Sequence, residues 1–172
     1  MILEEMNLQQ DRMLAERAGN MELLDCGERP PLPKNLVSSI DRIQKLLNQL
    51  KIIGESNVDQ ITEEIDALNL KQHVPELSKS IALNKFGVRE QSFIVDVCVL
   101  VHQRYEAFAE LLMSELEKQF KVTAITEFNK KRNILRTLTE LYFKGLAAEY
   151  QGIFKCLVNL ILINYEETAD DF

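Results

Sequence analysis

The sequence predicts an all-α fold, an α-solenoid in which antiparallel helix hairpins stack on one another. Three observations carry this prediction. Apolar residues recur at three- and four-residue spacing along most of the chain, only 6 glycines and 4 prolines occur, and no Asn-Gly or Asp-Gly turn is present. Helices of about 12–20 residues with short connections pack antiparallel, so we expect about three hairpins and no sheet, with a closed bundle as the competing architecture.

Length and composition describe an ordinary globular protein. The chain has 172 residues, of which 46% are hydrophobic and 27% charged, and its net charge is −7. The cysteines Cys26, Cys98 and Cys156 are widely spaced and odd in number, which is typical of reduced cysteines inside cells. Because the sequence shows neither a secretory leader nor an apolar run of about 20 residues, we expect a cytoplasmic protein without a membrane span. A perinuclear position or nuclear shuttling stays open.

A proline-rich segment marks the one clear internal boundary. Pro30, Pro31 and Pro33 exclude a regular helix there and indicate an extended linker. Before this segment, residues 2–18 carry a thin apolar stripe that predicts a short helix. We therefore divide the chain into residues 1–34, a helix plus linker, and residues 35–172, a helical-repeat domain.

Helical periodicity places seven helices after the linker. Asn35 is expected to cap the first, and Pro75 suits the first turn of the third. The stretch 92–102 is apolar enough to be a buried strand, but its length and its helical neighbours favour a helix. The last helix is rich in apolar residues on both sides, so its outer face needs a cover. The expected ranges are 36–53, 58–68, 75–84, 89–104, 105–121, 126–148 and 152–165.

The sequence offers no catalytic, metal or cofactor site. The two histidines, His73 and His102, lack a second ligand at helical spacing, and phosphate-loop and nucleophile-elbow motifs are absent. Carboxylate pairs such as Glu63 and Glu64 lie on amphipathic helices among other charges, where solvent keeps them ionised. We therefore expect a protein that is not an enzyme and that needs no cofactor.

One basic cluster stands out on this acidic chain. Lys130, Lys131, Arg132 and Arg136 lie near the start of a predicted helix, with residues 132 and 136 one turn apart. Such a cluster contacts phosphate groups or an acidic partner, or it is solvated. The alternative function is therefore an RNA-binding helical-repeat domain of a translation or mRNA-processing factor.

Two segments resemble a known family of helical-repeat domains. The stretch from Lys131 to Leu146 is similar to a helix shared by the middle domains of translation initiation factor four-G and its relatives. A second set of residues resembles the first middle domain of the up-frameshift two family, the scaffolds of nonsense-mediated mRNA decay. The resemblance covers about residues 35–165 and implies HEAT-like hairpins. The second set comprises Leu68-Asn69-Leu70 and His102-Gln103-Arg104-Tyr105, followed by Phe108, Leu111 and Leu112.

The resemblance implies a non-enzymatic adaptor of the mRNA surveillance complex. Its partners would be the up-frameshift helicase, a third up-frameshift protein and the associated kinase, reached through the full-length protein. The resemblance assigns no binding residue to this chain, because the best-known partner sites of the family lie in other domains. The chain has room for fewer hairpins than a complete middle domain, so we expect the N-terminal portion of one.

Three residues are expected to anchor a turn between two helices. His102 ends the apolar helix, and Arg104 and Tyr105 follow at a tight turn, where buried polar groups must find partners. Gly145 falls on the core stripe of its predicted helix. Glycine costs about 1 kcal/mol relative to alanine in a helix, so we expect a close approach of another helix there.

Overall fold

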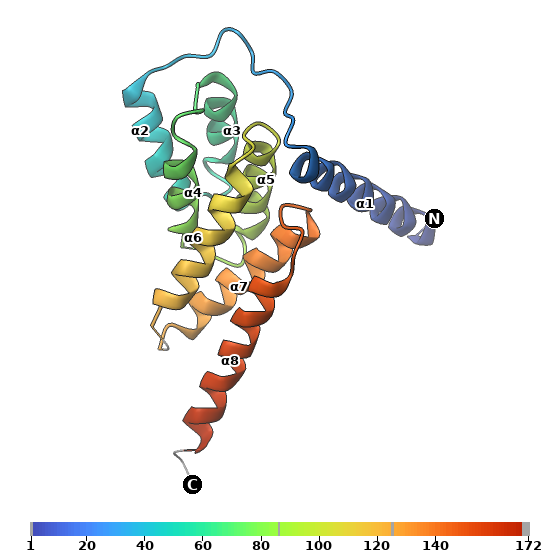
Figure 1. Cartoon of the computed structure of the whole chain (residues 1–172), viewed down its shortest axis with the longest axis vertical. Coiled ribbons are helices and arrows are strands. Elements are labelled where there is room, and N and C mark those ends of the chain that lie inside the picture. Colours follow the sequence, from blue (N-terminus) through green and yellow to red (C-terminus); the bar gives the residue numbers. More distant parts are fainter. Residues whose placement is uncertain (1, 86, 125, 170–172) are drawn as a thin grey trace.

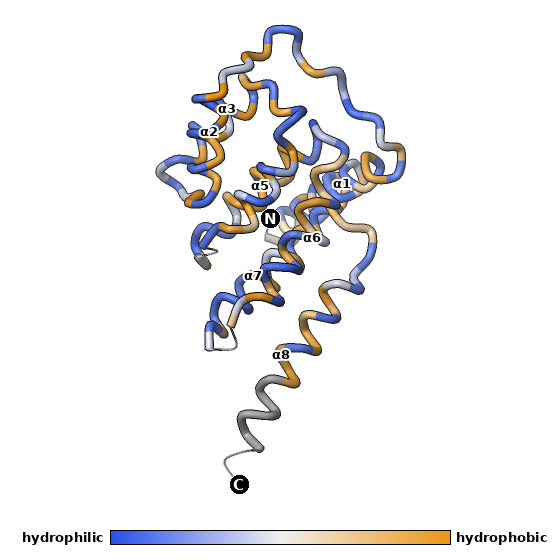
Figure 2. Tube along the Cα trace, turned by 60° about the vertical axis from the view of Figure 1, so that its left-hand side comes forward, coloured by the Kyte–Doolittle hydropathy of each residue, from blue (hydrophilic) through white to orange (hydrophobic). Residues whose placement is uncertain are grey.

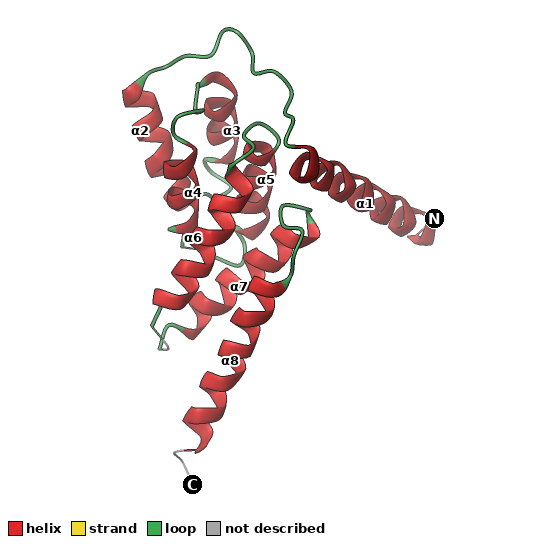
Figure 3. Ribbon diagram, in the orientation of Figure 1, coloured by secondary structure: helices red, strands yellow, loops and turns green. Residues whose placement is uncertain are grey.

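Most of the described residues are helical, as the periodicity predicts. The computed structural model describes residues 2–85, 87–124 and 126–169, and these contain no β-strand (Figures 1 and 3). The strand alternative for residues 92–102 is therefore wrong, since they form part of α5. The helices of the described residues are α1 (Ile2–Cys26), α2 (Ile40–Gln49), the 3-10 helix η1 (Leu50–Ile52), α3 (Val58–Ala67), α4 (Val74–Ala82), α5 (Gln91–His102), α6 (Phe108–Val122), α7 (Phe128–Phe143) and α8 (Gln151–Ala169).

Helices α2 to α8 stack in two layers. In one layer α4 contacts α6 and α6 contacts α8, while in the other α3 contacts α5 and α5 contacts α7. Contacts of α2 with α3, α5 with α6 and α7 with α8 join the layers (Figure 1). Each helix thus buries its apolar stripe against neighbouring helices, which is how a solenoid of hairpins is stabilised. The predicted fold class is confirmed, with α2 to α7 as three hairpins and α8 as a further helix.

The core consists mainly of aliphatic side chains on the inward sides of these helices. Leu46, Leu77, Ile94 and Leu112 have no exposed surface. Helix α5 contacts α3, α6 and α7, so most of its circumference is covered. This position explains why its sequence is almost continuously apolar and resembles that of a buried strand.

The first helix of the stack begins later than the sequence indicates. Ser39, rather than Asn35, caps α2, and its hydroxyl oxygen accepts a hydrogen bond from a backbone N–H in the first turn (3.5 Å). The residues before it are extended because the backbone of Val37 bonds to those of Ala67 (2.9 Å) and Asn69 (3.0 Å). This pairing uses backbone groups that a longer helix would need, so a non-local contact decides where α2 begins.

The N-terminal helix is longer than predicted, and one half of it lies against the stack. Helix α1 continues to Cys26 rather than ending at residue 18, and a non-helical segment over residues 27–39 joins it to α2. Its C-terminal half meets the ends of α5 and α7, whereas its N-terminal half projects away (Figure 1). The division at residue 34 stays a prediction, although the two parts are in contact. Within the described residues, no helix has the length and apolarity that a membrane span requires.

A buried asparagine holds α1 in place. Asn20 is 2% exposed, and its side-chain nitrogen donates to the carbonyl oxygen of Lys144 (2.8 Å), just after α7. Its side-chain oxygen accepts from Gln103 (3.2 Å), and its backbone oxygen lies 3.1 Å from Nε2 of His102. The last carbonyl groups of a helix lack partners within that helix. Asn20 therefore ties the C-terminal ends of both α5 and α7 to α1.

Two arginines reinforce the same contact. The guanidinium of Arg17 lies over the ring of Tyr142, 4.6 Å from its centre, and donates to the carbonyl oxygen of that residue. Arg29, in the linker, donates from Nε to the carbonyl oxygen of His102 (2.9 Å). Cations are stabilising near the C-terminal, negative ends of helices. Residues far away in the sequence thus complete the ends of α7 and α5.

Gly145 lies where the backbones of α7 and α1 approach each other. It comes two residues after Phe143, the end of α7, and its φ of 83° is the left-handed conformation that often ends a helix. A Cβ atom at this position would lie 2.5 Å from the backbone oxygen of Arg17. The expected place of Gly145 on the core stripe is wrong, because the helix ends first. The expected close approach of another helix is confirmed.

We predict that Gly145→Ala destabilises the protein by more than about 1–2 kcal/mol, which is the cost of a left-handed alanine alone, because the methyl group also meets the α1 backbone. The free energy of unfolding from urea titration measures this effect. Gly19→Ala is the matched control, since an added Cβ there has nothing within 4 Å, and it should stabilise α1 by up to about 1 kcal/mol. Equal effects of the two substitutions would contradict the close contact.

His102 makes this junction sensitive to pH. Its ring is fully buried, Nε2 donates to the backbone oxygen of Asn20, and Nδ1 has no hydrogen-bond partner among the described residues. Burial lowers the pKa of His102, the hydrogen bond to Asn20 opposes this shift in part, and the charge of Arg29 adds to it. A second proton on this ring would therefore be buried without an acceptor.

Because the unfolded chain takes up a proton before the folded one, His102 contributes its full stability above its ordinary pKa of about 6.5 and loses it as the pH falls toward the lowered value. We predict that the free energy of unfolding falls as the pH decreases below about 6.5, by at most about 1.4 kcal/mol per pH unit from this residue. His102→Gln, which keeps a donor in place of Nε2, should flatten the slope.

His73→Gln is the control for this pH titration, because it removes the other histidine, which lies at the start of α4 and outside the α1 junction. The slope should persist in that variant. An identical slope in His102→Gln and the unmodified protein would show that His102 does not cause it.

Candidate protein-binding surfaces

Two of the three expected anchor residues tie the α5–α6 turn to the segment around the end of α3. The hydroxyl oxygen of Tyr105 accepts from the backbone N–H of Leu70 (3.3 Å). Arg104 donates to the carbonyl oxygen of Ile65 (3.0 Å) and pairs with the Asp66 carboxylate (2.5 Å). Burial raises the pKa of Tyr105, so its phenol stays neutral and bonded. The third anchor residue, His102, lies at the end of α5 and contacts α1 instead.

The fold divides the basic cluster. Lys131 is only 3% exposed, and its ammonium group donates to the carbonyl oxygen of Phe120 (2.8 Å) and lies 4.5 Å from the centre of that ring. Burial lowers the pKa of Lys131. The ammonium group completes the last turn of α6, as a cation at a helix C-terminus does. Lys131 therefore does not lie on the exposed face that the sequence suggests for it.

The other three cations of the cluster are exposed, and two of them have acidic partners. Lys130 lies 3.7 Å from the carboxylate of Glu127, and Arg136 lies 3.0 Å from that of Glu140. Arg132 forms no ion pair within the part of the chain that the structure describes. Exposed pairs of this kind contribute little to stability, so a binding partner would displace them at small cost.

Helix α8 exposes a continuous apolar face at the edge of the stack. Its inner side packs on α6 and α7 and buries Cys156 and Leu160, which are 4% and 5% exposed. Figure 2 shows hydrophobic residues recurring along the coloured part of this helix. Contiguous exposed apolar surface is typical of an interface. The exposed side chains are Phe154, Leu157, Val158, Ile161 and Leu162.

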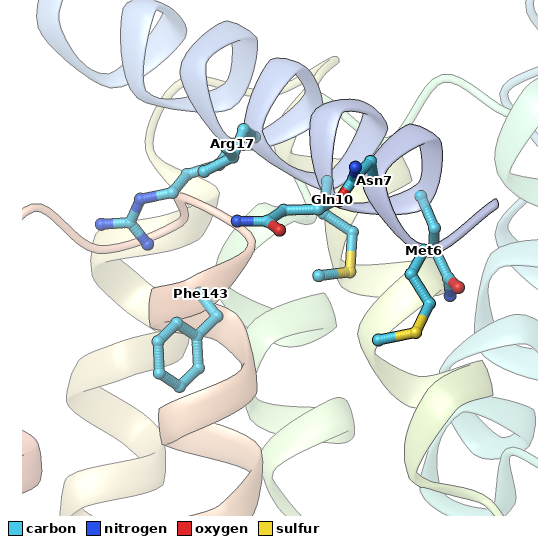
Figure 4. Close-up of a pocket in the computed structure, with 8 residues that line it drawn as sticks. Met6, Asn7, Gln10, Arg17 and Phe143 are labelled. Atoms are coloured by element: carbon cyan, nitrogen blue, oxygen red, sulfur yellow. The ribbon is translucent and has the colours of Figure 1, made fainter. Parts of the chain in front are cut away.

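A second apolar surface lies in the angle between α1 and the end of α7. Figure 4 shows Met6, Gln10 and Arg17 on the side of α1 that faces Phe143. Together with Met13 and neighbouring side chains they line an open groove of about 500 Å³. Both methionines and the phenylalanine are more than half exposed. We call this surface the α1–α7 groove.

Neither surface brings together groups for catalysis. In the described residues, no three His, Cys, Asp or Glu side chains are placed to hold a metal ion. Cys98 and Cys156 are buried free thiols, and burial raises the pKa of both. A buried thiol that stays protonated is a poor nucleophile.

Periodicity alone finds the α8 face but misses the α1–α7 groove. The missing information is the docking of α1, which depends on hydrogen bonds that Asn20 and Arg29 form to residues more than 70 positions away. One signal is present in the sequence. Met6, Gln10, Met13, Arg17 and Asn20 recur at alternating steps of four and three, a pattern typical of a helix that packs along another helix.

Curated relatives match nearly the whole chain, although no family model does. The chain is 28% identical to the human protein "Regulator of nonsense transcripts 2" over 151 residues, which cover 84% of the chain. It is 29% identical to "Regulator of nonsense transcripts UPF2" of Arabidopsis thaliana in an alignment of 181 residues that covers 98% of the chain. The chain spans 12% and 15% of the length of these relatives.

The comparison of folds leads to the same relatives. The crystal structure of the first MIF4G domain of human nonsense mediated decay factor UPF2 matches with a TM-score of 0.79 and 28% identity, over 91% of this chain and 53% of that chain. MIF4G denotes the middle domain of initiation factor four-G, so the resemblance suggested by the sequence is confirmed. In sequence and in fold, the chain is similar to the first MIF4G domain of UPF2.

Proposed function

We propose that the chain is a non-enzymatic scaffold module of nonsense-mediated mRNA decay, which presents helical surfaces to protein partners. The observation that carries this proposal is the outer face of α8, an uncovered apolar surface on a stack related to a MIF4G domain. A solenoid of hairpins binds through the faces of its helices and needs no reacting group. The names of the curated relatives support the assignment to decay of nonsense transcripts.

The outer face of α8 has the shape that a further helix requires. Phe154, Leu157 and Ile161 follow one another at steps of three and four, and the neighbouring Val158 and Leu162 lie four positions apart. Two such ridges form the groove into which another helix packs. Completing the burial of each side chain contributes on the order of 1 kcal/mol, because about half of its surface is still exposed. Five side chains therefore supply a substantial interface.

The occupant that we propose for this face is a helix hairpin of the same MIF4G type, which would continue the stack. The solved UPF2 domain supports this choice, because about half of it has no counterpart in the chain. The hairpin would pack on the outer side of α8, as α6 and α7 pack on its inner side. The binding sites for partners would then lie on the extended stack.

The partners in this proposal are the up-frameshift helicase, the third up-frameshift protein and the associated kinase, bound within the full-length protein in the cytoplasm. Direct RNA contact by the basic cluster is the second function. With Lys131 buried, only Lys130, Arg132 and Arg136 remain for phosphate groups. Three phosphate contacts give weak and strongly salt-dependent binding, so we rank this function second.

We predict that Ile161→Asp, made in the full-length protein, weakens its co-precipitation with the up-frameshift helicase by about tenfold or more, because a carboxylate on the α8 face opposes burial of that face. The amount of helicase recovered per amount of scaffold measures the effect. Ile40→Asp is the matched control, since Ile40 is 80% exposed at the start of α2, at the other end of the stack. It should bind as the unmodified protein does.

Two results would contradict different parts of the proposal. Failure of the unmodified protein to associate with any of the three decay factors would remove the scaffold function. Equal recovery with Ile161→Asp and Ile40→Asp would keep the function but remove the role of α8 in it. Circular dichroism of each variant shows whether the helices are retained.

A further inference from the structure

One side of α1 is docked in its C-terminal half and uncovered in its N-terminal half. Arg17 and Asn20 lie against the ends of α5 and α7, as described above. Met6, Gln10 and Met13 continue the same stripe, and they line the open α1–α7 groove instead (Figure 4). The stripe has the alternating spacing by which one helix packs along another. The N-terminal half of α1 therefore has a surface suited to packing against another helix, and no helix of the described residues covers it.

The groove continues along α7 as a longer trough. Phe143 lines both the α1–α7 groove and a second hollow, to which Val88 and Leu135 contribute apolar surface. Phe143 and Val88 are 66% and 60% exposed, so the apolar lining is accessible over both hollows. Together the two hollows form a site that is too long to be filled by a single side chain.

The charges that line the trough are mostly positive. Arg17 borders its α1 end, and Arg132 and Arg136 border its α7 end, against the single carboxylate of Glu140. The chain as a whole carries a net charge of −7, so the trough is a locally positive surface on an acidic protein. A partner of opposite charge would be favoured and a basic one disfavoured.

The acidic groups beside the trough do not cancel this charge. Glu16 pairs with Lys144 (2.8 Å). Burial raises the pKa of Asp96, and the charge of the same lysine opposes this shift. Lys144 thus offsets one of the two carboxylates, and neither carboxylate belongs to the lining of the trough. The cations of the trough lining remain in excess.

We propose that the trough binds an acidic amphipathic helix of a partner protein. Its apolar side would lie on Met6, Met13 and Phe143, and its carboxylates would face Arg132 and Arg136. Unbranched methionine side chains adapt to the shape of an inserted helix, and grooves of this kind accept apolar side chains at steps of three and four. This site lies on a different face from α8, so it goes beyond the proposed function.

The lining favours a protein helix over single-stranded RNA. Proteins that hold a single strand stack several bases on aromatic rings along a continuous cationic track. The trough has one exposed aromatic ring among methionine and aliphatic side chains. RNA and a second copy of the chain are therefore outcomes that the test must separate from the proposed helix.

Fluorescence anisotropy with the whole 172-residue chain tests the proposal. The probe is a synthetic, fluorescein-labelled helical peptide with leucine at steps of three and four and glutamate at the other positions. Its matched control replaces every glutamate with lysine, and labelled oligouridylate is the third ligand. At low salt we predict at least about tenfold tighter binding of the glutamate peptide than of the lysine peptide, and weaker binding as salt increases.

Substitutions in the chain locate the binding site. Phe143→Asp, and separately the double change Arg132→Glu and Arg136→Glu, should each weaken the glutamate peptide by about tenfold or more. The double change should also improve binding of the lysine peptide. Val122→Asp, at a residue 68% exposed at the end of α6, and Lys118→Glu, elsewhere on α6, are the matched controls and should change neither affinity.

Four results would overturn the proposal: no binding of the glutamate peptide, equal affinity for both peptides, tighter binding of oligouridylate, or loss of binding in the α6 controls. Sedimentation velocity adds a fifth, because self-association that Phe143→Asp abolishes would assign the trough to a second copy. Failure here is distinct from failure of the scaffold function, since Phe143→Asp leaves the α8 face intact.

Discussion

Each helix of the stack, from α2 to α8, buries an apolar stripe that neighbouring helices cover, and most of the structure follows from that constraint. In the middle of the stack both sides of a helix are covered, which is why α5 is almost continuously apolar. At the edge, α8 has a neighbour on one side only, and its opposite side stays exposed. The unpartnered surfaces of such a stack are therefore at its edge and on elements that lean against it, and these are the surfaces available for binding.

A second constraint concerns the ends of the helices, whose last carbonyl groups need partners. Asn20 and Arg17 supply them for α7, Arg29 for α5, and Lys131 for α6. All four come from distant parts of the chain or from another helix. The same need that fixes α1 on the stack also removes Lys131 from the basic cluster. Lys131 therefore stabilises the end of α6 and is not available to a binding partner.

The relation to the first MIF4G domain of UPF2 gives these surfaces a context. The chain shares the fold of that domain over most of its length but corresponds to only about half of it. The α8 face suits continuation of the stack, whereas the α1–α7 groove lies apart from that face. A hairpin packed on the α8 face would therefore leave the α1–α7 groove open to a partner.

The sequence by itself determined the helices, their inward stripes and the exposed outer side of α8, because the spacing of apolar residues is a local property that each helix carries alone. It also pointed to Tyr105 and Arg104 at their turn and excluded a strand-rich fold. Only the tertiary structure decided where α2 begins, where α1 docks, that Gly145 lies beyond α7, and which cations of the cluster are exposed. Each of these depends on partners distant in the sequence: Val37 with Asn69, Asn20 with Lys144, and Lys131 with Phe120. A hydrogen bond between residues that are not neighbours in the sequence does not change the spacing of apolar residues around either of them. The spacing therefore predicted which face of each helix is buried, but not the contacts that fix the position of each helix.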